Sequence, residues 1–362
     1  MTDLEKGREL INETDKQMAR LFEQRMDAVK LIVAYKKERG MPVEDLSREK
    51  EMIKRNTAAI ENEEYRSYYV SFLQSVVNVS KNLQHRLLDG LRVAYSGVEG
   101  AFAQIVAKRI LPEAACVPCS NFAAAYEAVV SGQCDCALLP VENSFNGDVG
   151  KVLDLAFFGP LYVTGVYEAE IVQNLLGVPG ACVEDVEKVI SHPQALGQCA
   201  AYIGQHGFQT EEAANTAVAA QQVAQLGQKN VAAIGSEEAA AQFGLVKLDS
   251  HINESSNNTT RFAMFSAAEK LPSRKDNHFI LLFTVKNIAG ALGQAISVIG
   301  EHGFNLRALK SRPTKELSWE YYFYAEGEGN IGSKEGKAML GELRQYCSHI
   351  KVLGSFEKEV KL

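Results

Sequence analysis

The sequence lacks the features that place a protein in a membrane or on a polyanion. No apolar run approaches eighteen residues, and the first ten residues mix acids and bases without an apolar core. Neither a membrane span nor an export signal is therefore expected. Basic residues are not in excess, since 38 Lys and Arg stand against 45 Asp and Glu. We expect no nucleic-acid or membrane partner, whereas small anionic substrates stay open because local Arg and Lys clusters bind carboxylates.

Cysteine is scarce and unevenly placed. There are seven, an odd number, and none precedes Cys116. This distribution favours reduced thiols over a disulfide framework and, without an export signal, predicts a cytoplasmic protein. Cys116 and Cys119 have the spacing of a redox or zinc site, but no second pair or matched His pair accompanies them. We expect buried thiols and no metal.

Glycine is absent between Gly7 and Gly40, and apolar positions in the first ninety residues recur at helical spacing. The pattern predicts one long helix that ends at residues 40–42, a second over 45–60 and a third over 65–88. The apolar stripe of the first helix consists of Leu4, Ile11, Met18, Leu21, Val29 and Ile32. Three such helices bury little in one copy, so we expect a homodimer or a higher homo-oligomer.

From residue 91 short apolar strands alternate with helices, which indicates an α/β fold. Strands are expected at residues 91–95, 136–139, 161–167, 189–191 and 231–234, in two lobes divided near Gly180 with a cleft between them. A polar linker at 271–277 precedes a βαββαβ order, the ferredoxin-like arrangement. The predicted domains are 1–88 (all-helical), 91–267 (two-lobed α/β) and 278–362 (α+β).

Two cations lie on the apolar face of the first helix. Arg25 is seven residues from both Met18 and Ile32, and Lys36 falls within about 20° of Arg25 around the helix axis. A buried cation without a partner costs several kcal/mol, so these groups need an anion. A compact dicarboxylate ligand would supply it; acids across a dimer seam would do so equally well.

The sequence Asp-Leu-Ser-Arg-Glu at 45–49, after the break at Pro42, resembles the second-helix motif of the all-helical chorismate mutases, and the resemblance covers residues 1–88. It implies the rearrangement of chorismate to prephenate without a cofactor. Lys36 and Gln84 would donate to the ether oxygen, and Glu49 would orient the hydroxyl. The other implied substrate contacts are Arg8 from the partner subunit, Arg25, Asp45, Arg48 and Ser80.

Three polar motifs stand at strand ends in the middle segment. They are Val-Glu-Asn-Ser at 141–144, Ser-His-Pro-Gln at 191–194 and Thr-Thr-Arg-Phe at 259–262. Ligands of open α/β sheets bind at the carboxyl ends of strands. A turn with Gly97 and Gly100 also precedes a helix, where a structural role is favoured over anion binding.

These motifs resemble those of prephenate dehydratases, over residues 91–267. The resemblance implies a periplasmic-binding-protein-like fold and the decarboxylation of prephenate with loss of its ring hydroxyl, giving phenylpyruvate. Thr260 would assist departure of the hydroxyl, and Arg261 would hold a substrate carboxylate. The other implied substrate contacts are Ser96, Glu142, Asn143, Ser144, His192, Gln194 and Gln198. One departure is Gln173-Asn174-Leu175-Leu176, where the family commonly has a His.

The last segment carries Asn-Ile-Ala-Gly-Ala-Leu at 287–292 and Lys-Ser-Arg-Pro at 310–313, which resemble ACT-domain motifs of phenylalanine-regulated dehydratases. The implied effector contacts are Gly290, Ala291, Leu292, Ser311, Arg312 and Pro313. Lys310 replaces the usual Glu of the second motif. A dimerisation module that has lost its ligand is the structural alternative. Trp319, the only tryptophan, would report phenylalanine binding by fluorescence.

Together the three resemblances point to the bifunctional chorismate mutase/prephenate dehydratases (P-proteins) of phenylalanine biosynthesis, with phenylalanine as effector. One alternative is a monofunctional prephenate or arogenate dehydratase with a non-catalytic helical dimerisation domain. Another is a non-enzymatic small-molecule-binding protein, which would normally carry the export signal that this sequence lacks.

Overall fold

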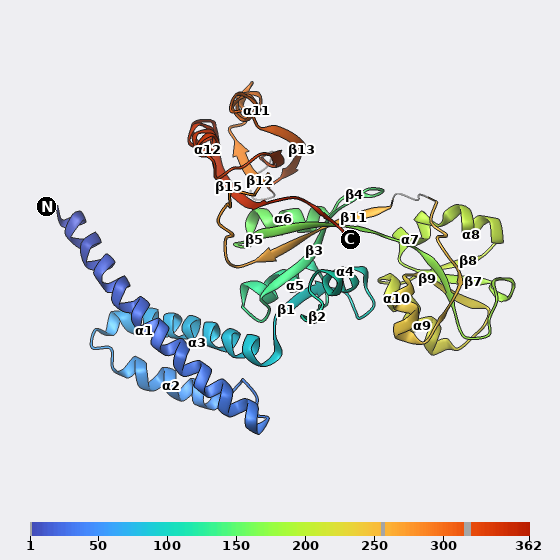
Figure 1. Cartoon of the computed structure of the whole chain (residues 1–362), viewed down its shortest axis with the longest axis horizontal. Coiled ribbons are helices and arrows are strands. Elements are labelled where there is room, and N and C mark those ends of the chain that lie inside the picture. Colours follow the sequence, from blue (N-terminus) through green and yellow to red (C-terminus); the bar gives the residue numbers. More distant parts are fainter. Residues whose placement is uncertain (1, 255–257, 315–319) are drawn as a thin grey trace. The chain divides into compact units, whose positions relative to one another are not determined.

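The computed structural model describes residues 2–254, 258–314 and 320–362 (Figure 1). Trp319, the predicted fluorescence reporter, lies outside these residues. The chain divides into two compact units. The first, here the helical unit, comprises Met1–Arg92 and Ser131–Asp135, and the second, the α/β unit, comprises Val93–Val130 and Cys136–Leu362.

The helical unit contains the three predicted helices, α1 (Asp3–Arg39), α2 (Leu46–Ala58) and α3 (Arg66–Asp89), with a short 3₁₀ turn, η1 (Glu63–Tyr65), before α3. Thr2 and Glu5 cap the start of α1 reciprocally, because each side chain accepts a hydrogen bond from the other residue's backbone N–H. Gly40 ends α1 in the left-handed conformation, which glycine adopts without strain.

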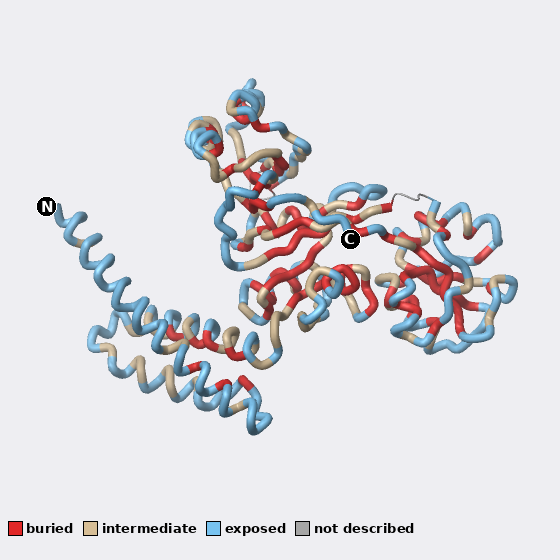
Figure 2. Tube along the Cα trace, viewed as in Figure 1, coloured by how far each residue is buried: buried red, intermediate tan, exposed pale blue. Residues whose placement is uncertain are grey.

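Burial in the helical unit is confined to one stretch of the bundle (Figure 2). Val29 and Val33 of α1 and Leu73 and Val77 of α3 are each less than 9% exposed, and the two helices contact each other. The rest of the predicted α1 stripe is open: Leu4, Ile11, Met18, Leu21 and Ile32 are each at least 37% exposed. One chain therefore does not bury this stripe, and an oligomer remains a prediction.

The α/β unit begins with a lobe whose sheet is flanked by the helices α4 (Phe102–Ile110), α5 (Phe122–Val130) and α6 (Gly150–Phe158). Its strands are β1 (Arg92–Ser96), β2 (Ala115–Cys119), β3 (Cys136–Asn143), β4 (Gly147–Asp148), β5 (Tyr162–Glu170) and β11 (Thr259–Ser266). The order β5-β11-β3-β1-β2 places β11 antiparallel between β5 and β3. Leu138 and Leu139 of β3 are fully buried, as in a strand covered on both faces.

The second lobe has its own sheet in the order β10-β6-β9-β7-β8. Its strands are β6 (Asn174–Gly177), β7 (Lys188–Ser191), β8 (Gln209–Glu212), β9 (Val231–Gly235) and β10 (Val246–Asp249). The helices are α7 (Pro193–Gln198), α8 (Ala200–His206), α9 (Thr216–Leu226) and α10 (Glu237–Phe243), with a short 3₁₀ turn, η2 (Val183–Asp185), between β6 and β7.

The predicted division between the lobes at Gly180 is wrong by several residues. The chain crosses to the second sheet between Glu170 of β5 and Asn174 of β6, and Gly180 forms a turn after β6. The chain then returns to the first sheet as β11. The glycine was misleading because it marks a turn within the second lobe, whereas the crossing itself contains neither Gly nor Pro.

Residues 278–361 form β12 (His278–Val285), α11 (Ala291–Glu301), β13 (Asn305–Pro313), β14 (Tyr321–Glu328), α12 (Lys334–Tyr346), β15 (Cys347–Phe356) and β16 (Val360–Lys361). The order β13-β14-β12-β15 gives the expected ferredoxin-like arrangement. This sheet joins that of the first lobe, because β15 pairs with β5 at Gly354 and Val163, and β16 also pairs with β5. A Cβ on Gly354 would stand 2.2 Å from the Val163 carbonyl oxygen, so the junction requires glycine.

Among the described residues, no helix is long and apolar enough to span a membrane.

Candidate functional sites

The predicted mutase residues of α1 and α3 meet at the buried part of the helical unit. Arg25 donates a hydrogen bond to the Ser80 hydroxyl, and Ser80 donates to the Val76 carbonyl at 2.8 Å. Gln84 lies one turn further along α3, 8% exposed, and its Oε1 has no hydrogen-bond partner among the described residues. Burial lowers the pKa of Arg25. A half-buried cation beside neutral groups fits the expected anion site, whereas Gln84 would have to exchange its amide oxygen and nitrogen to donate to an anion.

Lys36 and Glu49, two further predicted catalytic residues of the helical unit, make local contacts. Lys36 Nζ donates to the carbonyl of buried Val43 at 2.6 Å, which fixes the loop before α2. Glu49 on α2 forms an ion pair with Lys81 of α3 at 3.1 Å. Lys81 escaped the sequence analysis. Its position one residue after Ser80 gave no signal, because a lone Lys on a helix is usually solvated.

Three predicted mutase residues stand apart from this cluster in the single chain. Arg8 is exposed on the first part of α1, and Arg48 is exposed on α2. Asp45 is also exposed and caps α2, with its carboxylate accepting from the Arg48 N–H at 3.1 Å. The expectation that Arg8 serves a partner subunit's site stays untested.

The α/β unit has a cavity of about 500 Å³ lined by residues of both lobes. Six of the predicted substrate contacts line it: Ser96, Asn143, His192, Gln194, Gln198 and Thr260. Four further polar side chains, Ser120, Gln173, Asn215 and Thr216, were not predicted to line it. No Asp, Glu, Lys or Arg is among the described lining residues. The polar groups that a ligand would meet are therefore hydroxyls, amides, an imidazole and backbone N–H groups.

The orientation of the Asn143 amide is fixed by the backbone. Its Oδ1 accepts from the N–H groups of Phe145 and Asn146 at 3.1 and 2.9 Å. Its Nδ2 donates to the Thr259 carbonyl at 3.1 Å and to Thr260 Oγ1 at 3.0 Å. Because Thr260 Oγ1 accepts from Asn143, its own hydrogen stays available to a ligand in the cavity.

A chain of amides continues from Asn143 to the junction between the lobes. Asn143 Nδ2 also donates to Asn258 Oδ1 at 2.9 Å, and Asn258 Nδ2 donates to the Ile171 carbonyl and to Gln198 Oε1. Gln173 Nε2 donates to the same Gln198 oxygen at 3.3 Å. Neither Asn258 nor Gln173, each 2% exposed, was predicted as a site residue, and Gln173 was noted only as a departure from the family pattern. This network links amide side chains of both lobes to the Thr260 hydroxyl through hydrogen bonds.

His192 caps α7, and its Nδ1 accepts from the Gln194 N–H at 3.2 Å. Burial lowers the pKa of His192, and the charge of Glu212 opposes this only in part. The imidazole is therefore neutral at pH 7, with its hydrogen on Nε2. Since His192 lines the cavity, it can offer this N–H as a neutral donor.

Three predicted substrate contacts do not line the cavity, and these placements are corrections. Ser144 is exposed and accepts from the Thr259 N–H at 3.0 Å. Glu142 and Arg261 are register partners on β3 and β11, next to Asn143 and Thr260. Side chains alternate between the faces of a strand, so the residues beside the cavity-lining pair point to the opposite face.

On that face Arg261 donates to Glu142 Oε2 at 2.8 Å. Its two terminal nitrogens donate to the two carboxylate oxygens of Glu326 of β14 at 3.0 and 2.7 Å. It also donates to Glu359. Burial alone would lower the pKa of Arg261, but these carboxylates outweigh it and raise the pKa. The Arg261 guanidinium thus binds carboxylates of its own chain and does not reach the cavity.

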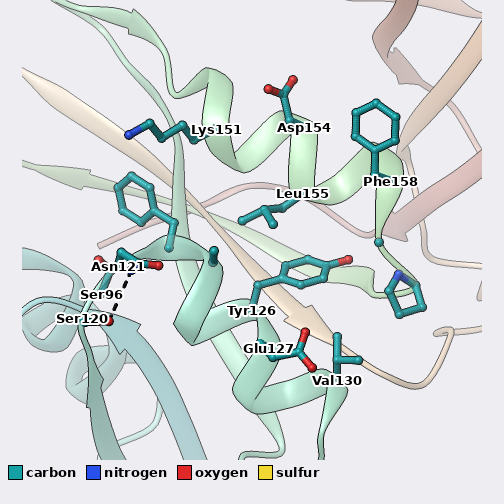
Figure 3. A pocket seen from close by; sticks show the side chains of 14 residues that line it. Ser96, Ser120, Asn121, Tyr126, Glu127, Val130, Lys151, Asp154, Leu155 and Phe158 are labelled. Carbon is teal, nitrogen blue, oxygen red and sulfur yellow. Dashed lines mark hydrogen bonds between the residues drawn. The ribbon is translucent and has the colours of Figure 1, made fainter. Parts of the chain in front are cut away.

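A second hollow of about 730 Å³ lies between α5 and α6 and shares Ser96, Ser120 and Phe122 with the first (Figure 3). Tyr126 and Leu155 face each other across it. Its walls are mainly apolar.

The predicted effector residues fall into two groups. Gly290, in the left-handed conformation, and buried Ala291 begin α11, where Leu292 lines a hollow of about 520 Å³. Ser311, Arg312 and Pro313 end β13 and do not line that hollow. Arg312 donates to Asp154 of α6 at 2.8 and 3.2 Å. In a single chain these two groups do not form one site.

Known protein families match the helical unit and the α/β unit separately. Residues 93–270 match the family model of prephenate dehydratase, and residues 7–85 match that of chorismate mutase type II. Arogenate dehydratase/prephenate dehydratase 1 of Arabidopsis thaliana is 32% identical over 286 residues, which cover 75% of this chain and 73% of that relative. The chain belongs to the prephenate dehydratase family.

Within that family, a relative with the same two catalytic parts covers the whole chain. The bifunctional chorismate mutase/prephenate dehydratase of Aquifex aeolicus (strain VF5) is 29% identical over 366 residues, with 99% of each chain covered. The crystal structure of prephenate dehydratase from Arthrobacter aurescens in complex with L-Phe has a TM-score of 0.69 and 25% identity, covering 74% of this chain and 90% of that one. The predicted helical mutase domain and two-lobed dehydratase fold are confirmed.

Proposed function

We propose that this chain rearranges chorismate to prephenate in its helical unit and converts prephenate to phenylpyruvate in its α/β unit. The observation that carries the proposal is the pairing of Thr260 and Asn143 in the uncharged cavity, together with the Arg25 cluster in the separate helical unit. Neither step needs a cofactor. The reactions are consecutive steps of phenylalanine biosynthesis.

In the mutase step, Arg25 binds a carboxylate of chorismate. Lys36 and Gln84 donate to the ether oxygen as negative charge develops there, for which Gln84 turns its amide. The chemistry requires no covalent intermediate, because preorganised donors lower the barrier electrostatically. Arg8 of the partner subunit, Asp45, Arg48 and Ser80 are assigned to substrate binding, and Glu49 to the hydroxyl.

In the dehydratase step, the ring carboxylate leaves as CO₂ and its bonding electrons move into the ring, which expels the hydroxyl at the opposite carbon. The departing oxygen gains a proton to become water, and an aromatic ring results. Thr260 donates a hydrogen bond to this oxygen as it departs, and Asn143 holds the Thr260 hydroxyl in place. The proton that converts the released hydroxide to water comes from solvent. Donation to a leaving group in the transition state is the main contribution a protein can make here.

Neutral groups bind the substrate's carboxylates in this account. α4 begins at Phe102 without a side-chain cap, and Ala101, Phe102 and Ala103 line the cavity, so we assign the first N–H groups of α4 and the positive end of its dipole to a carboxylate. Ser96, His192, Gln194 and Gln198 add further donors. An environment without cations leaves the ring carboxylate's charge weakly stabilised, which favours its loss as CO₂.

The same cavity favours prephenate over arogenate. Arogenate carries an ammonium where prephenate has a keto group, and no acid is among the described lining residues. Burying an ammonium without a carboxylate costs several kcal/mol. We therefore expect kcat/KM for prephenate to exceed that for arogenate by about 10- to 100-fold, or about 1.4 to 2.7 kcal/mol.

The test supplies purified protein with prephenate or arogenate separately and measures phenylpyruvate and phenylalanine. Phenylpyruvate from prephenate, with much slower release of phenylalanine from arogenate, supports the proposal. Faster turnover of arogenate would overturn the substrate assignment. Tight binding of prephenate without any product would identify a binding protein instead.

The C-terminal sheet is proposed to be an ACT domain that makes the dehydratase sensitive to phenylalanine. Support comes from its ferredoxin-like order and from the family's L-Phe-bound structure. The residues assigned are Gly290, Ala291, Leu292, Ser311, Arg312 and Pro313. Because the two groups lie apart in one chain, the site would require a second copy, in keeping with the proposed homodimer. Two measurements test this assignment: the inhibition of dehydratase turnover by phenylalanine, and the binding of phenylalanine followed by calorimetry.

A further inference from the structure

The two catalytic strands carry a second residue pair on the face away from the cavity. Thr260 and Asn143 are register partners, and so are their neighbours Arg261 and Glu142. The first pair lines the cavity, whereas the second pair forms an ion pair at 2.8 Å. A displacement of Arg261 along its strand would therefore move Thr260 by a similar amount, since one peptide unit joins them.

Arg261 is anchored mainly by groups from the C-terminal sheet and the tail. Glu326 of β14 accepts from both terminal nitrogens of its guanidinium, a bidentate geometry that fixes orientation as well as distance. Tyr324 donates to the same carboxylate at 2.6 Å. Glu359, just before β16, is a further acceptor. The side chains of Arg261, Glu326 and Glu359 are 16%, 7% and 12% exposed, so solvent screens these contacts little.

Lys310 attaches Glu142 to the same sheet. Its Nζ donates to Glu142 at 2.8 Å and to Asp148 at 2.5 Å. Each catalytic strand is thus tied to the C-terminal sheet through the residue next to its cavity-lining member.

We propose that Arg261 and Glu142 are positioning residues for the dehydration, and that Glu326, Glu359 and Lys310 hold them so that the Thr260 hydroxyl points at the leaving oxygen. The inference rests on the proposed dehydratase function. It replaces the assignment of Arg261 to a substrate carboxylate. Reaching the cavity would require Arg261 to give up four hydrogen bonds and cross the sheet.

Small displacements suffice to matter for the rate. Reacting groups must stand within about 3–3.5 Å in the right direction, and an error of about 1 Å can lower a rate by about 100-fold. Binding of the substrate depends on many cavity groups and tolerates such an error better. A positioning role therefore predicts a loss in kcat with little change in KM.

The experiment uses the full chain with Arg261→Lys, Glu326→Gln and the double variant, and measures kcat and KM for prephenate. Arg261→Lys keeps the charge but loses the bidentate grip, and Glu326→Gln removes one anchor that does not line the cavity. We expect each single variant to lower kcat at least tenfold with KM within about twofold. The double variant should be no slower than the slower single variant, because both break one interaction.

Glu342→Gln is the matched control, since Glu342 pairs with His302 in the same C-terminal sheet region without contact to Arg261. Its kcat should equal that of the unmodified chain. Melting temperatures accompany each rate. If Arg261→Lys does not fold, Glu326→Gln decides the question alone.

Two results would overturn the proposal. An increase in KM for Arg261→Lys at unchanged kcat would mean that the guanidinium binds substrate. Unchanged kcat in Glu326→Gln with a lowered melting temperature would mean that the contact between Glu326 and Arg261 only stabilises the fold. If the unmodified chain does not convert prephenate at all, the proposed dehydratase function fails, which is distinguishable from both results.

Discussion

Thr260→Val removes the hydroxyl that the dehydration depends on and keeps the shape of the side chain. Thr260 is 8% exposed at the start of β11, where a β-branched residue suits the strand. Asn143 Nδ2 loses one acceptor at 3.0 Å but keeps Asn258 Oδ1 at 2.9 Å and the Thr259 carbonyl at 3.1 Å. The stability loss should therefore be about 1 kcal/mol, or about 2–4 °C in melting temperature.

The effect on catalysis should be much larger. Removing one preorganised donor to a developing oxyanion costs about 10²- to 10³-fold in kcat, or about 2.7–4 kcal/mol. The assay follows phenylpyruvate from prephenate at saturating substrate. Thr260→Ser, which keeps the hydroxyl, is the matched control and should stay within about tenfold. If Thr260→Val retains most of its kcat, the hydroxyl is not the donor and the reasoning fails.

Three further outcomes follow from the structure. Lys36→Ala should abolish mutase turnover of chorismate and leave dehydratase turnover of prephenate unchanged; an unaltered mutase rate would remove Lys36 from the site. Gly354→Ala should destabilise the α/β unit by about 1–3 kcal/mol in thermal denaturation, because its Cβ would meet the Val163 carbonyl, whereas Gly341→Ala, with no atom within 4 Å, should not. The half-buried His192 has a pKa below its usual value of about 6.5. Its stabilising contribution is therefore complete above about pH 6.5 and is lost as the pH falls below that value. Dehydratase kcat/KM should fall over the same acidic range, and a loss of activity on the alkaline side of about pH 7 instead would contradict the assignment.

Helix positions were predictable because periodicity and caps are local. Gly40 and the capping residue Asp45 mark ends that the structure reproduces within a few residues. The ferredoxin-like order was equally readable from strand and helix lengths. What the sequence could not supply was pairing over long distances. The return of β11 to the first sheet depends on contacts with β5 and β3, which end 89 and 116 residues before β11 begins.

The motifs that form the site were predictable from the sequence, but the directions in which their side chains point were not. Thr260 and Asn143 line the cavity as expected, but Arg261 and Glu142 do not. Strand alternation could have revealed this, because neighbours on one strand cannot both face a ligand. Gln173 was noted only as a departure from the family pattern. Its contact with Gln198 could not be predicted, because tertiary packing at the junction between the lobes sets it.

The resemblance to phenylalanine-regulated dehydratases was weakest at Lys310, where the family usually has Glu. In the structure this lysine contacts Glu142 and Asp148 of the first lobe. Burial would lower the pKa of Lys310, yet the hydrogen bonds of Asp148 and Glu142 raise it, so the contact stays charged at neutral pH. The substitution therefore has a physical role in joining the C-terminal sheet to the catalytic strand β3.

The most direct test supplies chorismate to the unmodified chain, to Thr260→Val and to Lys36→Ala, and follows chorismate, prephenate and phenylpyruvate together. Two consecutive sites in one chain predict phenylpyruvate from the unmodified protein and prephenate accumulating with Thr260→Val. Lys36→Ala should leave chorismate intact and still convert added prephenate. No loss of chorismate in the unmodified protein, or phenylpyruvate formed at the full rate by Thr260→Val, would contradict the account.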